Sequence, residues 1–258
     1  MALAEHTTKV FDSDLQELSR TIAEMGGLAE KQIAEAIEAL TTRDSGRARR
    51  TIAADATIDV MQHNIEERAG ETIVRRQPVA GDLRQIIGVL RIANELERIG
   101  DLAKNIGKRI VEINGEDMPP RSMRGVTHMA TLILAQLHDV LDSFASRDVT
   151  KAVDVWKRDQ EVDRLCTSLF RELLTYMMEG SVRISIGAHL LFCTKNLERM
   201  GDHATNIAEA VYYMVKGETL STERPKADFT SMLKAAMESP GKYLLRQSGI
   251  AGAGLESA

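Results

Sequence analysis

The chain has 258 residues, of which 43% are hydrophobic and only 4% aromatic. This length allows one large domain or two small ones, and so few aromatic residues disfavour a β-sandwich or β-barrel. The formal net charge of -5 argues against a nucleic-acid-binding protein, because neutralising phosphates requires clustered cationic side chains. Two cysteines are too few for a disulfide framework and suit a reducing compartment.

No targeting or membrane segment is visible in the sequence. Residues 1–11 are interrupted by Glu5, His6 and Lys9, so they lack the continuous apolar stretch of a secretory signal. The most apolar segment, 184–193, is shorter than the ~20 residues that a membrane-spanning helix needs. We therefore expect a soluble, cytoplasmic protein that meets a membrane only through partner proteins.

Apolar residues recur in steps of three and four along nearly the whole chain, which is the pattern of amphipathic helices. The breaks between these stripes are short. Asp44 and Asp148 have the character of helix N-caps, and Pro78 and Gly180 mark turns. Six long helices are predicted, at residues 8–42, 45–76, 82–114, 121–147, 149–179 and 183–216. Long helices joined by tight connections favour antiparallel bundles.

The chain repeats itself. The segment Leu96–Asp101 returns as Leu197–Asp202 at an offset of 101, and Asp55 returns as Asp159 at an offset of 104. The change in offset implies three residues fewer in the second copy, which we place at the turn around Gly180. We predict an all-α fold of two tandem, internally homologous three-helix bundles, at residues 8–115 and 119–217. Residues 218–258 form a tail, rich in Gly and Ala at its end, that we expect to be largely disordered.

Each copy carries two pairs of acidic residues with the spacing acid-x-x-x-acid. This spacing places both carboxylates on one helix face, about 5–6 Å apart at Cβ. The acids prolong or border the apolar stripes, and partly desolvated carboxylates need a cation. An all-oxygen site suits Mg, Mn or Fe better than structural zinc. The predicted metal ligands are Asp55, Asp59, Glu97, Asp101, Asp159, Asp163, Glu198 and Asp202.

A glycine precedes the last acid of each copy, at Gly100 and Gly201. Because a glycine inside a helix costs about 1 kcal/mol relative to Ala, we expect it to leave open space between the two acids for an ion. The alternative is a solvated acidic face, in which Arg98 pairs with Asp101 and Arg199 with Asp202. A ferritin-like oxidase is disfavoured, because Gly201 stands where that class has histidine.

These patterns together resemble the PhoU family, the accessory proteins of the phosphate-specific transport system. The resemblance spans about residues 15–217. The matching segments are the two Leu-Glu-Arg-(Ile/Met)-Gly-Asp copies, Met25-Gly26-Gly27, Arg76-Gln77-Pro78 with Asp82-Leu83-Arg84, Tyr176-Met177-Met178-Glu179, and Tyr212-Tyr213-Met214-Val215-Lys216-Gly217.

The resemblance implies two related three-helix bundles that bind multinuclear metal, often iron, at the eight acidic residues named above. It also implies a non-catalytic negative regulator of phosphate signalling that commonly forms homodimers. Its expected partners are the ATPase subunit of the phosphate importer and a sensor histidine kinase.

Two other functions stay open from the residues alone. One is an all-α, metal-dependent phosphohydrolase of the nucleotide-pyrophosphatase type, since clustered carboxylates can hold metal that activates water. The other is a helical scaffold without metal. We predict no catalytic residue, and we expect Cys166 and Cys193 to be small core residues rather than reactive thiols.

Overall fold

The predicted helix starts at residues 45 and 149 are set by aspartate side chains. In the computed structural model the Asp44 carboxylate accepts the backbone N–H of Arg47 at 2.9 Å. The Asp148 carboxylate accepts the N–H groups of Thr150 and Lys151. Each aspartate thus satisfies N–H groups that the first helical turn leaves free, which confirms both predicted N-caps.

The structure describes residues 2–113 and 116–220, and these ranges contain six α-helices and no strand. The all-α prediction is therefore confirmed. The predicted tail lies outside the described residues from residue 221 onward. The helices are α1 (Ala2–Thr42), α2 (Ser45–Arg76), α3 (Ala80–Ile113), α4 (Pro120–Ser146), α5 (Val149–Met178) and α6 (Ser181–Lys216).

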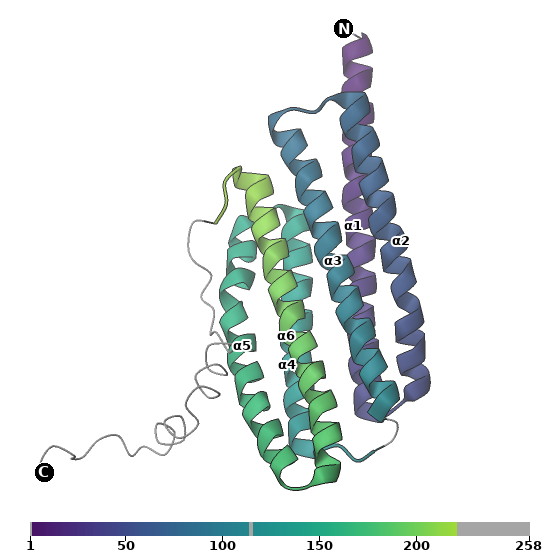
Figure 1. The fold of residues 1–258 in the computed structure, drawn as a ribbon. Coiled ribbons are helices and arrows are strands. Elements are labelled where there is room, and N and C mark those ends of the chain that lie inside the picture. Colours follow the sequence, from purple (N-terminus) through teal and green to yellow (C-terminus); the bar gives the residue numbers. More distant parts are fainter. Residues whose placement is uncertain (1, 114–115, 221–258) are drawn as a thin grey trace, which may run out of the picture. The chain divides into compact units, whose positions relative to one another are not determined.

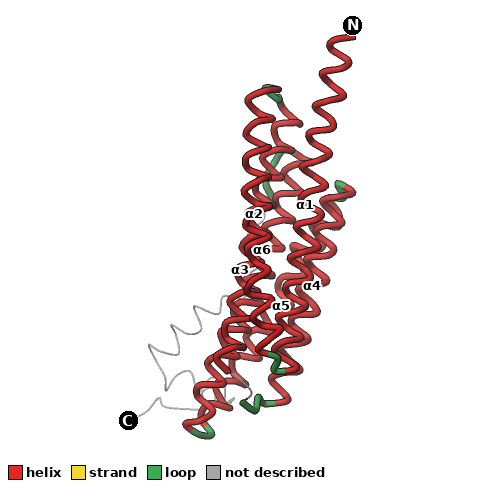
Figure 2. The backbone as a smooth tube through the Cα atoms, turned by 90° about the vertical axis from the view of Figure 1, so that its right-hand side faces the viewer, coloured by secondary structure: helices red, strands yellow, loops and turns green. Residues whose placement is uncertain are grey.

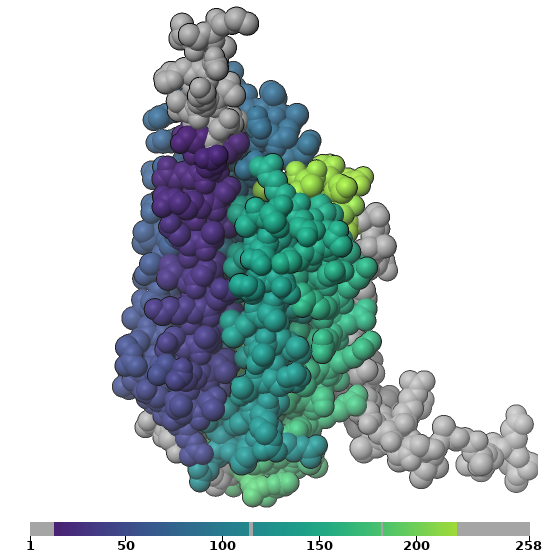
Figure 3. Space-filling view, turned by 180° about the vertical axis from the view of Figure 1, so that it is seen from behind, coloured from purple at the N-terminus to yellow at the C-terminus, as the bar shows by residue number. Residues whose placement is uncertain are grey.

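The helices form two trios that run alongside one another (Figures 1 and 2). Helices α1, α2 and α3 pack against each other, and so do α4, α5 and α6. Between the trios, α3 packs against α6 and α1 against α4, while α2 and α5 lie on the outer flanks. In the space-filling view the surface of α1 borders that of α4 (Figure 3). One hydrophobic core runs through both trios.

The three-residue difference between the repeats lies where the sequence placed it. Helix α5 has 30 residues against 32 in α2. The connection that follows α5 has two residues, Glu179 and Gly180, whereas three residues separate α2 from α3. None of the described helices has an apolar stretch sufficient to traverse a lipid bilayer.

Gly26 allows α1 and α4 to approach closely. A Cβ built on Gly26 would lie 2.6 Å from a methyl carbon of Leu141 on α4. The neighbouring Gly27 has nothing within 4 Å of such an atom. Only the first glycine of the pair is therefore required by packing.

Candidate metal centres

The acidic residues of each repeat lie on two helices that pack against each other. Asp55 and Asp59 lie on α2, opposite Glu97 and Asp101 on α3. Their counterparts in the second repeat lie on α5 and α6 in the same arrangement. The deepest member of each set comes from the flanking helix: Asp55 and Asp159 are both 2% exposed.

The four carboxylates of the first repeat lie close enough for the charges of Asp55 and Asp101 to affect the protonation of Glu97 and Asp59. Burial raises the pKa of Glu97, and the negative charges of Asp101, Asp59 and Asp55 raise it further against the opposing effect of Arg98. Burial likewise raises the pKa of Asp59, with Asp55 and Asp101 adding to the effect. We call Asp55, Asp59, Glu97 and Asp101 the first carboxylate cluster.

A lysine that the sequence analysis missed supplies a cation to this cluster. The Lys104 ammonium donates to Asp55 Oδ2 at 2.5 Å and to Asp101 Oδ1 at 2.8 Å. These two hydrogen bonds raise the pKa of Lys104, so it stays charged at neutral pH. Lys104 follows Asp101 by three residues on the same helix face, and that spacing was the available signal. Arg98, the expected partner of Asp101, instead has its Nε 3.4 Å from Glu97.

The second repeat has a different residue at the position of this lysine. Its four acids, which we call the second carboxylate cluster, are Asp159, Asp163, Glu198 and Asp202. At the offset of 101, Thr205 stands where the first repeat has Lys104. Thr205 is fully buried, and its hydroxyl donates to the carbonyl of Gly201 at 3.0 Å. The second repeat therefore has no ammonium group at the position equivalent to Lys104.

The second cluster lies beside a lysine near the surface and a buried thiol. Lys195 donates to Glu198 Oε1 at 2.7 Å from near the surface, while the buried Oε2 of Glu198 has no hydrogen-bond partner in the described part of the chain. The pKa of Cys166 is raised to about 12, first by burial and then by the charges of Glu198, Asp163 and Asp202. Three acids of this cluster thus lie near one buried thiol.

Gly100 does not leave open space between the acids, so that prediction was wrong. A Cβ at Gly100 would lie 3.1 Å from Gln32 Oε1 and 3.2 Å from Asp55 Oδ1. The glycine instead lets two polar side chains from α1 and α2 approach the backbone of α3. At Gly201 the corresponding contacts, to Gln136 Oε1 and Asp159 Oδ1, are looser, at 3.6 Å each.

The buried glutamines are a part of both clusters that the sequence analysis missed. Gln32 and Gln136 are 4% and 3% exposed and stand 104 residues apart, the same offset as Asp55 and Asp159. The Oε1 atoms of both glutamines and Oδ1 of Asp55 are buried acceptors without a hydrogen-bond donor among the described residues. The shared offset was the signal that could have found them.

These donor atoms suit a hard cation. Carboxylate and amide oxygens are the ligands that such ions prefer, and buried acceptors without a partner are costly unless something binds them. Within the described residues, no three or more His, Cys, Asp or Glu side chains lie together as a group that could hold a metal ion. A cation entering the first cluster would have to displace the Lys104 ammonium, because that group already bridges Asp55 and Asp101.

Fold and site together define an all-helical protein built from two copies of a three-helix, carboxylate-bearing repeat. A family model described as the PhoU domain matches residues 22–110 and again residues 126–211. The chain belongs to the PhoU family, and the predicted tandem repeat is confirmed.

Proteins named PhoU are similar to this chain in sequence and in structure. The chain is 50% identical over 228 residues to the "Phosphate-specific transport system accessory protein PhoU homolog" of Rhizobium meliloti, covering 88% of this chain and 96% of that one. It is 44% identical over 229 residues to the protein of the same name from Caulobacter vibrioides, covering 89% and 100%. The crystal structure of PhoU from Pseudomonas aeruginosa superposes with a TM-score of 0.78 at 39% identity, covering 81% of this chain and 100% of that one.

Proposed function

We propose that this chain is a non-enzymatic regulator of phosphate uptake and of phosphate-starvation signalling. It acts as a helical adaptor between the ATPase subunit of the phosphate importer and a sensor histidine kinase, and it represses starvation genes when phosphate is abundant. The observation that carries this proposal is the 50% identity, over nearly nine tenths of the chain, to a protein named for the phosphate-specific transport system. We further propose that it works in the cytoplasm as a homodimer.

The proposal includes a metal at each carboxylate cluster. The first metal would be held by Asp55, Asp59, Glu97 and Asp101. The second would be held by Asp159, Asp163, Glu198 and Asp202. The unpartnered oxygens of Asp55 and Glu198 support this assignment, because each is a buried acceptor without a donor. Iron, manganese or magnesium fits an all-oxygen donor set, and a multinuclear centre would use all four acids. A bound cation would neutralise the acids and tie α2 to α3 and α5 to α6.

The first cluster carries its own cation. The Lys104 ammonium bridges Asp55 and Asp101, whereas Thr205 stands at the equivalent position of the second repeat. Replacing Lys104 with Met should therefore let the first cluster bind metal at lower concentration than it does in the wild type.

Elemental analysis of protein purified without chelator tests the metal assignment. We expect bound metal in the wild type and loss of it in Asp101→Ala combined with Asp202→Ala. Asp154→Ala is a matched control, because Asp154 is an exposed aspartate of α5 outside the cluster. Equal metal content in all three proteins would show that the ligands are misassigned.

A strain that lacks the protein tests the signalling role. Starvation genes should stay active there in abundant phosphate and should be repressed again when the wild-type chain is restored. If those genes switch off normally without the protein, the regulatory proposal fails. A separate turnover assay addresses the phosphohydrolase alternative. We expect no hydrolysis of nucleoside triphosphates by metal-loaded protein, and hydrolysis that disappears in Glu97→Ala would contradict a non-enzymatic role.

A further inference from the structure

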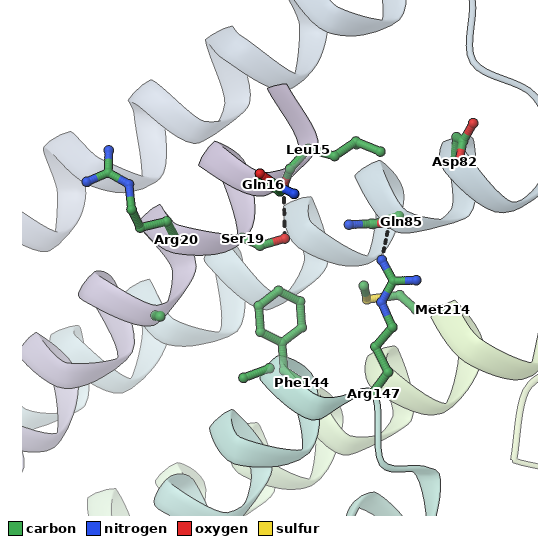
Figure 4. Close-up of a pocket in the computed structure, with 11 residues that line it drawn as sticks. Leu15, Gln16, Ser19, Arg20, Asp82, Gln85, Phe144, Arg147 and Met214 are labelled. Carbon is green, nitrogen blue, oxygen red and sulfur yellow. Dashed lines mark hydrogen bonds between the residues drawn. The ribbon is translucent and has the colours of Figure 1, made fainter. Parts of the chain in front are cut away.

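A hollow lies between the two repeats, and none of the eight acids of the carboxylate clusters lines it. It has a volume of about 570 Å³ and is lined by α1, α3, the C-terminal end of α4, and α6 (Figure 4). An adjoining hollow of about 270 Å³ shares Asp82, Gln85, Phe144, Arg147 and Met214 with it and adds Arg84. We call the two together the inter-repeat cavity.

Two arginines of this cavity have no acidic partner. Arg147 donates to the neutral side-chain oxygen of Gln85 at 2.6 Å. Arg84 has a buried Nε–H without a hydrogen-bond partner. No carboxylate of the described residues lies within 4.0 Å of either guanidinium. A buried N–H on a charged group is costly to leave unpaired, so it points to an anion that completes the site.

The first repeat provides an internal comparison for Arg147. Arg43 occupies the equivalent position, 104 residues earlier, and both arginines follow the end of a helix with a left-handed backbone, at φ of 57° and 55°. Arg43 pairs with Asp117 at 2.6 Å, whereas Arg147 donates to the amide oxygen of Gln85 and forms no ion pair with a described carboxylate. The same backbone position thus carries a neutralised arginine in one repeat and an arginine available to an anion in the other.

The remaining lining is mixed in character. Arg20 extends the positive charge at the edge of the cavity, although Glu17 and Glu24 partly neutralise it. Asp82, the acid that lines both hollows, has its carboxylate directed away from Arg147 (Figure 4). Phe144 and Met214 supply an apolar wall beside the arginines.

We propose that the inter-repeat cavity binds a phosphate-bearing small molecule. Guanidinium groups recognise phosphate through paired, charge-assisted hydrogen bonds. The cavity volume is in the range of small-molecule sites, about 300–1,000 Å³. It exceeds what a bare phosphate fills, and the wall of Phe144 and Met214 suits an attached organic group such as a nucleoside. Phosphate held between Arg84 and Arg147 would join α3 of the first repeat to α4 of the second.

The chain's own C-terminal segment is a poor candidate for the anion. Residues 221–258 contain five Lys and Arg against four Asp and Glu, so they carry no negative excess to match the arginines. The proposed ligand site also does not depend on the carboxylate clusters or on the signalling role, because it uses other residues. Its test can therefore fail while the proposed function stands.

Isothermal titration of the full chain with AMP, and separately with inorganic phosphate, tests the proposal. We expect saturable binding of at least one of the two, weakened about tenfold or more in Arg147→Gln and in Arg84→Gln. Arg43→Gln, the matched control, should bind as the wild type does. If AMP binds more tightly than inorganic phosphate, the difference is attributed to packing of the nucleoside against Phe144 and Met214.

Two results would overturn the proposal. The first is no saturable binding of either compound at millimolar concentration; if an oligoglutamate peptide binds in that case, the cavity is assigned to an acidic segment of a protein partner. The second is binding that Arg147→Gln and Arg84→Gln leave unchanged. Circular dichroism and the midpoint of thermal unfolding establish that each variant is folded.

Discussion

Replacing Lys104 with Met removes the cation from the first carboxylate cluster while keeping a similar aliphatic chain. Asp55, 2% exposed, then keeps a buried charge whose ammonium partner lay at 2.5 Å. Removing one partner of a buried ion pair costs about 3–5 kcal/mol. The Lys104 side chain is 26% exposed, so solvent screens part of the interaction and we expect a loss of about 2–3 kcal/mol.

Urea unfolding at pH 7 in the presence of a chelator measures this loss. The control is Lys108→Met, one turn further along α3, where the side chain is exposed. A surface change of that kind should stay within about 0.5 kcal/mol. In an Asp55→Asn background the cost of Lys104→Met should fall toward that of the control, because no buried charge is left without its partner.

The same variant tests whether a metal can replace the ammonium. Without chelator, Mn²⁺ should raise the unfolding midpoint of Lys104→Met more than that of the wild type, since binding to the folded state stabilises it. If Lys104→Met costs no more than Lys108→Met, the ammonium does not compensate Asp55, and the reasoning about the first cluster is wrong.

The packing around two glycines and the burial of the two thiols give three further predictions. Gly100→Ala should be about 1–2 kcal/mol less stable than Gly27→Ala, because its Cβ would meet Gln32 and Asp55 at 3.1–3.2 Å and this crowding opposes the helix preference of alanine. Gly27→Ala should raise the free energy of unfolding by about 1 kcal/mol in urea titrations, because the site is open and alanine favours helix. Burial raises the pKa of Cys166 and of Cys193 to about 12, so both thiols stay protonated at pH 8. A chromogenic thiol reagent at pH 8 should therefore label native protein slowly and unfolded protein fast; fast native labelling would contradict the buried assignment.

The sequence was sufficient for most of the helical architecture. Periodicity and the capping aspartates predicted α2 at the residues where it lies, Ser45–Arg76. The start of α3 was predicted two residues late, at residue 82, because Ala80 enters the helix with a left-handed φ of 48° that an alanine gives no reason to expect. The start of α1 was predicted six residues late, at residue 8 instead of Ala2, because no apolar stripe or capping residue marks it.

The candidate site was predictable in part. Spacing and the repeat placed all eight acids on two pairs of packed helices, and the structure has them there. Gln32 and Lys104 were missed because Gln32 meets Asp55 through the packing of α1, and Lys104 meets Asp55 through the packing of α3 on α2. Helical periodicity does not specify either contact, although the repeat offset and the i,i+3 spacing could have drawn attention to the two residues. Metal ligation by these acids stays a prediction.

Complementation tests the central claim most directly, because it joins the pathway to the carboxylate clusters. A deletion strain carrying a starvation-gene reporter would receive the wild-type chain, Asp101→Ala with Asp202→Ala, or the control Asp154→Ala, each checked for equal abundance. In abundant phosphate we expect repression by the wild type and the control, and failure of repression by the double variant. Full repression by the double variant would contradict the claim that these clusters serve the regulatory function.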